Sequence, residues 1–172
     1  MECNIVLIGM PASGKTTIGN LLAERLGYIL IDTDSFIEKT SGMMIAEIFE
    51  KYSEDYFRKL EYDAIKLVCS GAGKKIVSIG GGAFENPDTR NTLLNFGKVF
   101  YLKSDLDVLY YRISNDTSRP LLQTENPKEA LEKLLSKREE NYLKAHYTIN
   151  TSNLETDEII NYLLGHINET NS

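Results

Sequence analysis

The stretch Gly9-Met10-Pro11-Ala12-Ser13-Gly14-Lys15-Thr16 indicates the fold of the whole chain. It fits the pattern G-x-x-x-x-G-K-[ST], in which glycines allow consecutive backbone N–H groups to curl around a phosphate. The apolar run 4–8 before it predicts a strand, and the amphipathic segment after it predicts a helix. A glycine-containing turn without a ligand is the alternative, but such a turn would not require this placement. The sequence therefore predicts a phosphate-binding loop, which we call the phosphate loop (residues 9–16).

The polar residues of the phosphate loop have distinct expected roles. Lys15 is expected to reach the β and γ oxygens of a nucleoside triphosphate, and the Thr16 hydroxyl is expected to bind Mg²⁺. Backbone amides and the dipole of the following helix would hold further phosphate oxygens. The predicted nucleotide-binding residues here are Met10, Pro11, Ala12, Ser13, Gly14, Lys15, Thr16 and Thr17.

Short β-branched runs alternate with longer helical patterns along the rest of the chain. That alternation is typical of a parallel sheet covered by crossover helices. Asn86 before Pro87 and Asn126 before Pro127 indicate two helix starts, each with a side chain placed to cap it. We predict one α/β domain over residues 1–172, with three α/β/α layers around five parallel strands at 4–8, 28–31, 75–79, 99–102 and 147–150.

Two segments exceed what a plain crossover requires. Residues 35–52 and 54–70 carry two helical patterns, so this region is expected to build something besides a cover for the sheet. Residues 114–125 are polar and have no periodic pattern, with Arg119-Pro120 in the middle. They are typical of a flap over a site, and an ordinary surface loop is the alternative.

The composition excludes several classes of protein. Nineteen Lys and Arg against 25 Asp and Glu give a net charge of −6 and a pI near 5.0, which argues against nucleic acid or an anionic membrane as the main partner. No apolar run approaches the roughly 20 residues that cross a bilayer, and no basic signal-like region precedes the first strand, so we expect a cytoplasmic protein. Cys3 and Cys69 lack a CxxC pattern or a nearby histidine cluster, which disfavours zinc and disulfides.

Two carboxylates follow the second predicted strand. Asp32 and Asp34 lie at its carboxyl end, the edge at which open α/β sheets bind ligands. We assign Asp32 to Mg²⁺ through water and Asp34 to an acceptor hydroxyl. The alternative is that either acid merely caps the next helix.

Three glycines and one arginine complete the candidate acceptor site. Gly80-Gly81-Gly82 follow the third predicted strand and would allow close approach of a ligand to the backbone, or else form a flexible turn. Arg58 and Glu61 are three residues apart on a predicted helix, so they can pair and hold the guanidinium in one pose for a carboxylate.

Together these motifs resemble those of the shikimate kinase family. The resemblance covers nearly the whole chain, in order and spacing: GMPASGKT, DTD, SGMMIAEIF, FRKLE, GGGA, RPLL and Arg138-x-x-x-Tyr142-x-x-Ala145. It implies a P-loop kinase fold with a substrate-binding insertion at about 33–61 and a lid at about 112–125. It also implies transfer of the ATP γ-phosphoryl, with Mg²⁺, to the 3-hydroxyl of shikimate, on the route to chorismate and aromatic amino acids.

The resemblance also implies roles for individual residues. Lys15, Asp34 and Arg119 would be catalytic, Arg112 and Arg119 would complete the ATP site, and Thr16 and Asp32 would hold the metal. The chain departs from the family where Ala12 and Ser53 replace residues that are often glycine. The implied substrate-binding residues are Asp34, Arg58, Gly80, Gly81, Gly82 and Arg138.

Other functions remain open at this point. A kinase of the same fold that acts on another small hydroxy acid or on a nucleoside monophosphate would share most of these motifs. A nucleotide-dependent switch or an inactive binding module is a more distant alternative, and no Asn-Lys dipeptide is present for a guanine-reading Asn-Lys-x-Asp motif. We expect a monomer whose partners are shikimate and ATP.

Overall fold

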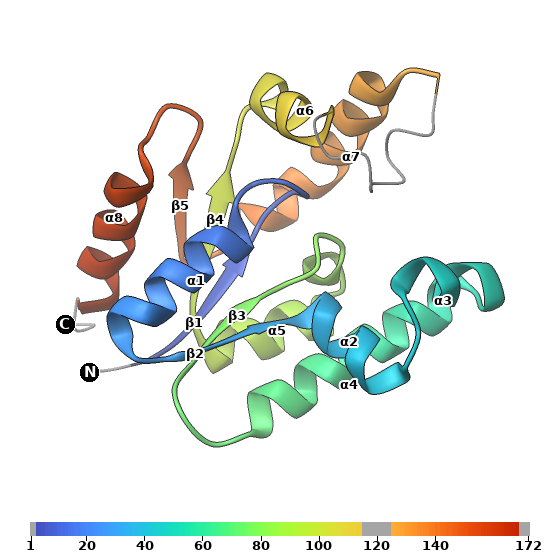
Figure 1. Cartoon of the computed structure of the whole chain (residues 1–172), viewed down its shortest axis with the longest axis horizontal. Coiled ribbons are helices and arrows are strands. Elements are labelled where there is room, and N and C mark those ends of the chain that lie inside the picture. The colour runs from blue at the N-terminus through green and yellow to red at the C-terminus, as the bar shows by residue number, and fades with distance from the viewer. Residues whose placement is uncertain (1–2, 115–124, 169–172) are drawn as a thin grey trace.

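The computed structural model describes residues 3–114 and 125–168. Within them, five parallel strands form one sheet in the order β2-β3-β1-β4-β5 (Figure 1). All five predicted strands are confirmed, with ends that differ by at most two residues. Their bounds are β1 Asn4–Ile8, β2 Ile29–Asp32, β3 Lys75–Ser78, β4 Gly97–Lys103 and β5 Tyr147–Asn150.

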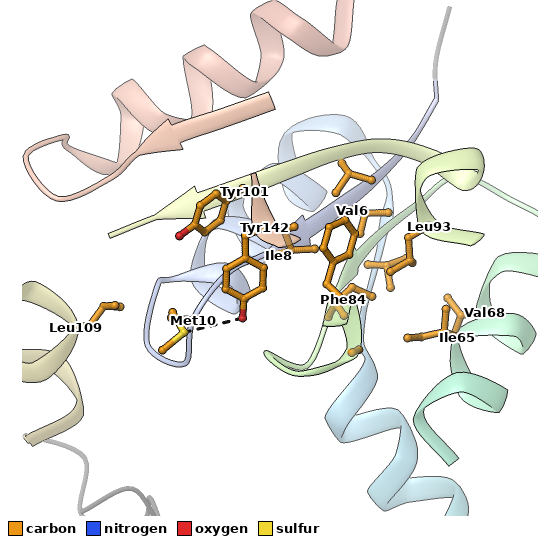
Figure 2. Packing of buried hydrophobic residues seen from close by; sticks show 14 of the residues in the cluster. Val6, Ile8, Met10, Ile65, Val68, Phe84, Leu93, Tyr101, Leu109 and Tyr142 are labelled. Carbon is orange, nitrogen blue, oxygen red and sulfur yellow. Dashed lines mark hydrogen bonds between the residues drawn. The ribbon is translucent and has the colours of Figure 1, made fainter. Parts of the chain in front are cut away.

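The helices cover both faces of the sheet, as the three-layer prediction requires (Figure 1). Successive residues of a strand point to opposite faces, so Ile5 and Leu7 pack with α1 (Lys15–Leu26) and α8 (Thr156–Asn168). Val6 and Ile8 belong to the cluster on the other face, which Figure 2 shows at close range. The helices that contribute to this second cluster are α4 (Glu54–Ser70), α5 (Pro87–Phe96), α6 (Leu106–Ser114) and α7 (Pro127–Tyr142).

The region between β2 and β3 differs from its prediction. The single helical pattern at 35–52 is two helices, α2 (Thr33–Ser41) and α3 (Ile45–Lys51). Gly42 separates them because its φ of 69° is a left-handed conformation that ends α2 and that other residues rarely adopt. The predicted helix over 54–70 is confirmed as α4. These helices enclose a small core of their own, formed by Ile37, Ile48, Phe57 and Ala64.

The two predicted helix starts have different outcomes. Asn86 Oδ1 accepts hydrogen bonds from the backbone N–H groups of Asp88 and Thr89, which confirms it as the cap of α5. A short 3₁₀ helix, η1 (Ala83–Glu85), precedes this cap. Pro127 does begin α7, but the Asn126 side chain makes no capping hydrogen bond, so that detail of the prediction is wrong.

No helix among the described residues is both long enough and apolar enough to span a bilayer. Most of the predicted flap, including Arg119, lies outside the described residues.

Candidate active site

The phosphate loop connects β1 to α1 and carries the predicted nucleotide site. Gly14 precedes α1, and Lys15 is its first residue. The Lys15 ammonium donates hydrogen bonds to the carbonyl oxygens of Gly9 and Met10, at 3.0 and 2.9 Å, and so stays close to its own loop. Ala12, the departure from glycine, has a φ of 63°, a left-handed conformation that disfavours a side chain. Ala12 therefore adopts a left-handed backbone conformation that glycine would adopt at a lower energetic cost.

A cleft of about 610 Å³ lies against this loop. It brings together most of the predicted donor residues with Asp32 and Asp34. Met10 does not line it, because its side chain is buried in the core. The predicted site residues on its wall are Pro11, Ala12, Ser13, Gly14, Lys15, Thr16, Thr17, Asp32, Asp34, Gly80, Gly81 and Arg112.

The carboxylate of Asp32 has two sets of partners. Oδ1 accepts hydrogen bonds from the N–H groups of Asp34 and Ser35, so it caps α2. Oδ2 accepts hydrogen bonds from the hydroxyls of Thr16 at 3.2 Å and Ser78 at 3.1 Å. The capping interpretation of Asp32 is therefore confirmed, and the second oxygen still faces the threonine assigned to the metal.

The Thr33 side chain links the start of α2 to Gly80, just after the end of β3. The buried Thr33 hydroxyl accepts a hydrogen bond from the N–H of Gly80 at 3.0 Å.

Burial raises the pKa of the Asp34 carboxyl, the charge of Asp32 raises it further, and the charge of Lys15 lowers it. An aspartate held above its ordinary pKa in a cleft is suited to accept a proton from an alcohol.

The glycine segment (residues 80–82) is packed by charged side chains. A Cβ on Gly80 would lie 2.5 Å from Asp34 Oδ1, and a Cβ on Gly82 would lie 2.6 Å from Nη1 of Arg58. A Cβ on Gly81 would lie 2.9 Å from Nη1 of Arg138. Glycine is needed here because each position leaves room for a different charged group, and none of the three has a positive φ.

Arg58 is held by two glutamates. Its Nη1 lies 2.7 Å from Oε2 of Glu61, which confirms the predicted pair, and its Nη2 lies 3.2 Å from Oε1 of Glu54. The Glu61 side chain is only 4% exposed, whereas that of Glu54 is 69% exposed. Ser53, the second departure from the family pattern, caps α4 by accepting a hydrogen bond from the N–H of Tyr56. The guanidinium is thus fixed before any ligand arrives.

Burial raises the pKa of Glu61, and Arg58 acts in the opposite direction. The charge of Asp34 raises the same pKa, while that of Arg138 lowers it. These two acids and two arginines therefore form one electrostatic cluster around the glycine segment.

The two remaining described arginines of the prediction contact different loops of the site. Nη1 of Arg112 donates a hydrogen bond to the carbonyl of Ala12 at 3.2 Å and lines the cleft. Arg138 is half-buried beside Gly81, which agrees with an inward position on α7. Arg58, Gly82 and Arg138 lie beyond the wall of the main cleft and extend the site past Gly80 and Gly81.

Sequence reasoning missed several residues of the site. Glu54 and Ser78 hold groups assigned above, yet each has a residue type that is common in helices or strands and so gave no signal. Tyr142 belongs to a motif that resembles the family, but nothing in that motif indicated its hydrogen bond to Gly81. Another part of the wall comes from the segment between β5 and α8 and from α8 itself, and it includes Thr151, Leu154, Thr156 and Ile159. The apolar stripe of α8 is typical of a core helix, and Ile159 does pack in the core while also reaching the cleft.

The site has two halves: a donor half at the phosphate loop, and an acceptor half at the glycine segment with its two arginines. Amides, Lys15 and Thr16 suit the phosphates of a nucleotide, while Arg58 and Arg138 suit a small carboxylate. Asp34 lies where the two halves meet, because it lines the main cleft and flanks Gly80. Such a geometry can transfer a phosphoryl group to a hydroxyl of an anionic acceptor.

Comparison with known proteins gives a consistent result. The family model for shikimate kinase matches residues 11–168 of the chain. The shikimate kinase of Thermodesulfovibrio yellowstonii is 40% identical over 156 residues, which cover 91% of this chain and 90% of the relative.

Solved structures agree in fold. Shikimate kinase from Acinetobacter baumannii in complex with shikimate superposes with a TM-score of 0.90 at 37% identity, covering 97% of this chain and 93% of that one. A gluconokinase from Sinorhizobium meliloti has a TM-score of 0.65 at 18% identity, covering 96% and 91% of the two chains, and so shares the fold alone.

Proposed function

The chain belongs to the shikimate kinase family, whose members are ATP-dependent phosphotransferases acting on a hydroxyl of shikimate, and on this premise we propose how its residues carry out the transfer. The proposed reaction moves the γ-phosphoryl of ATP to the 3-hydroxyl and yields shikimate 3-phosphate and ADP. It is a step in aromatic amino acid biosynthesis. The proposal rests on one observation. Asp34 lines the cleft at the phosphate loop and also packs against the glycine segment, which Arg58 and Arg138 contact as well.

The donor half binds ATP. Backbone amides of the phosphate loop and Lys15 hold the phosphates, and Thr17 and Arg112 extend the nucleotide site. Because the Lys15 ammonium is bonded to loop carbonyls, it exchanges those partners for phosphate oxygens when ATP arrives. The aliphatic and hydroxyl side chains of α8 and of the segment before it give the cleft a wall for the rest of the nucleotide.

Thr16 and Asp32 are suited to Mg²⁺. Their oxygens lie 3.2 Å apart at the edge of the cleft, and hard oxygen donors are those that Mg²⁺ prefers. Among the described residues no group of three or more His, Cys, Asp or Glu side chains could form a metal cage, and Mg²⁺ commonly takes phosphate oxygens and water for most of its ligands. When bound, the ion neutralises charge on the β and γ phosphates.

The acceptor half binds shikimate. Arg58 and Arg138 hold its carboxylate, and Asp34 with Gly80, Gly81 and Gly82 faces its hydroxyls. Glu61 keeps Arg58 in a single pose, so less side-chain freedom is lost on binding. The carboxylate of shikimate has two oxygens in one plane, which matches the fork of donors on a guanidinium.

Asp34 orients the acceptor hydroxyl and takes its proton as the oxygen attacks phosphorus. Its raised pKa makes it a better base than an ordinary exposed aspartate. Lys15 stabilises the charge on the transferring group, and Arg119 is proposed to do the same. Positioning and neutralisation of charge then supply most of the rate enhancement.

We further propose that the protein is a cytoplasmic monomer that has no nucleic acid partner, as its net charge of −6 suggests. Size-exclusion chromatography with light scattering tests the monomer.

An ADP-release assay tests the function. The purified protein is given ATP and Mg²⁺ with shikimate, gluconate or a nucleoside monophosphate in separate reactions. ADP should form at a substantial rate only with shikimate. Equal or faster release with one of the other acceptors would overturn the assignment of the acceptor site.

A further inference from the structure

Two buried tyrosines lie side by side in the core beneath the active site. The rings of Tyr101, on β4, and Tyr142, at the end of α7, have centroids 4.9 Å apart (Figure 2). Both side chains are fully buried. Their hydroxyls nevertheless have different surroundings. Tyr101 Oη has no hydrogen-bond partner among the described residues, whereas Tyr142 Oη donates to the carbonyl oxygen of Gly81.

Tyr142 contacts both halves of the site. Its hydroxyl bonds the middle of the glycine segment and also lies 4.0 Å from Sδ of Met10 in the phosphate loop, the contact drawn as a dashed line in Figure 2. A Cβ on Gly81 would lie 3.3 Å from Cδ of Pro11, so the two loops touch at this point. Arg138 is one helical turn before Tyr142 on α7 and reaches the same glycine.

The attachment of α7 to this region does not depend on the Tyr142 hydroxyl. Nη1 of Arg90 donates hydrogen bonds to the carbonyl of Phe84 at 3.0 Å and to Oδ1 of Asn141 at 3.1 Å. Asn141 in turn donates to Oε1 of Glu85 at 3.2 Å. Arg90 is therefore a half-buried bridge between η1 and α7.

We propose that Tyr142 is a positioning residue whose hydroxyl fixes the glycine segment against the phosphate loop and thereby aligns the acceptor hydroxyl with the γ-phosphoryl. The proposal rests on the function assigned above. The hydroxyl acts on the reaction through Gly81 and Arg138 rather than by touching the reacting atoms. It also serves only as a neutral donor, because burial raises the pKa of Tyr142 to about 12 and the charge and hydrogen bond of Arg138 only partly oppose that effect.

The test compares Tyr142→Phe with Tyr101→Phe. Each variant loses one buried hydroxyl and keeps its ring, so packing between the rings is retained. For Tyr142→Phe we expect kcat to fall by about tenfold while KM for ATP changes by less than about twofold, because only alignment is lost. The shape of the pH profile of kcat should stay the same. Tyr101→Phe should keep the wild-type kcat.

Amide hydrogen exchange gives a readout that does not depend on activity. In Tyr142→Phe the amides of residues 81–84 should exchange faster than in the wild type, while those of β1 and β4 should not. A kcat within about twofold of wild type, or an equal loss of kcat in Tyr101→Phe, would overturn the proposal. Unchanged exchange at residues 81–84 would also overturn it. If shikimate were not the substrate, the wild-type assay would fail but the exchange difference would persist.

Discussion

The hydroxyl of Thr16 donates a hydrogen bond to Oδ2 of Asp32 at 3.2 Å and so joins the first turn of α1 to the end of β2. The two residues are 16 positions apart in the chain, and parallel pairing of β2 with β3 and of β3 with β1 brings their strand ends to one edge of the sheet. Asp32 uses its other oxygen to cap α2. One carboxylate therefore links Thr16, the proposed metal ligand on α1, to the start of α2.

Asp32→Asn should weaken binding of Mg²⁺·ADP by about 10- to 100-fold, as expected when an outer partner of a metal site loses its charge. The fold should survive, because Asn is as good a helix cap as Asp. Isothermal titration calorimetry measures the effect. Asp34→Asn is the matched control and should bind Mg²⁺·ADP nearly normally. Equal affinity of the Asp32 variant and the wild type would remove Asp32 from the metal site.

Lys15→Ala should lower kcat by about 10²- to 10³-fold, because a charge aimed at the transferring phosphoryl is lost. The variant also loses two hydrogen bonds to loop carbonyls, so circular dichroism must show that it is folded. Single-turnover kinetics with saturating shikimate measure the loss. Turnover at the wild-type rate would refute the role of Lys15.

Asp34→Asn should make the protein much less active but more stable. A carboxyl with a raised pKa binds its proton more tightly in the folded than in the unfolded state. Its cost to stability is absent below the ordinary pKa of 3.8 and grows as the pH rises through the raised value. Urea unfolding from about pH 3.5 to about pH 8 should therefore show a smaller decline with pH in the variant, since only Glu61 still contributes such a cost within the cluster.

The single-turnover rate of Asp34→Asn separates the two possible roles of this residue. A base contributes about 10²- to 10⁴-fold and gives the wild-type rate a pH limb that the variant lacks. A variant with the wild-type pH profile and only a modest loss of rate would make Asp34 an orienting group.

Glu61→Gln and Glu54→Gln form a matched pair around Arg58. The Glu61 side chain is nearly buried where it pairs with Arg58. We therefore expect loss of this ion pair to raise KM for shikimate by about tenfold, which corresponds to about 1.4 kcal/mol. The exposed Glu54 pair should change KM by less than about threefold, as pairs in water contribute about 0.2–1 kcal/mol. Steady-state assays at fixed ATP measure both. The reverse order would show that Glu54, not Glu61, holds the guanidinium.

Gly82→Ala and Gly80→Ala should damage different steps. The methyl group added at position 82 would displace the end of Arg58, a flexible side chain, so the fold should tolerate the change while KM for shikimate rises. The methyl group added at position 80 would meet Oδ1 of Asp34 at 2.5 Å and Oε1 of Glu61 at 2.9 Å, so kcat should fall strongly, with a smaller rise in KM for shikimate through Glu61. Kinetics on both variants, with ATP affinity measured as a control, test this separation. Similar losses of kcat and KM in the two variants would contradict it.

Local signals explain why much of the site could be predicted. The phosphate loop, the two acids and the glycines each lie at the carboxyl end of a strand, and strand ends of a parallel sheet converge on one edge. The pairing of Arg58 with Glu61 follows from helical spacing. Other details gave no local signal. The missing cap at Asn126 and the bridging role of Arg90 depend on how neighbouring elements pack. The break at Gly42 is different, because the glycine itself is a local signal for the end of a helix that a single helical pattern over 35–52 overlooks.

By itself the sequence determined which chemical groups are present and in what order, because short motifs fix backbone shape and charge locally. It could not determine why three consecutive glycines are required. Only the tertiary structure places Asp34, Arg138 and Arg58 against them, from three separate helices. It likewise distinguishes Tyr142 from Tyr101, two buried tyrosines of which one bonds the active-site backbone. Hydrogen bonds between residues far apart in the chain exist only after the core has packed, and so no local pattern encodes them.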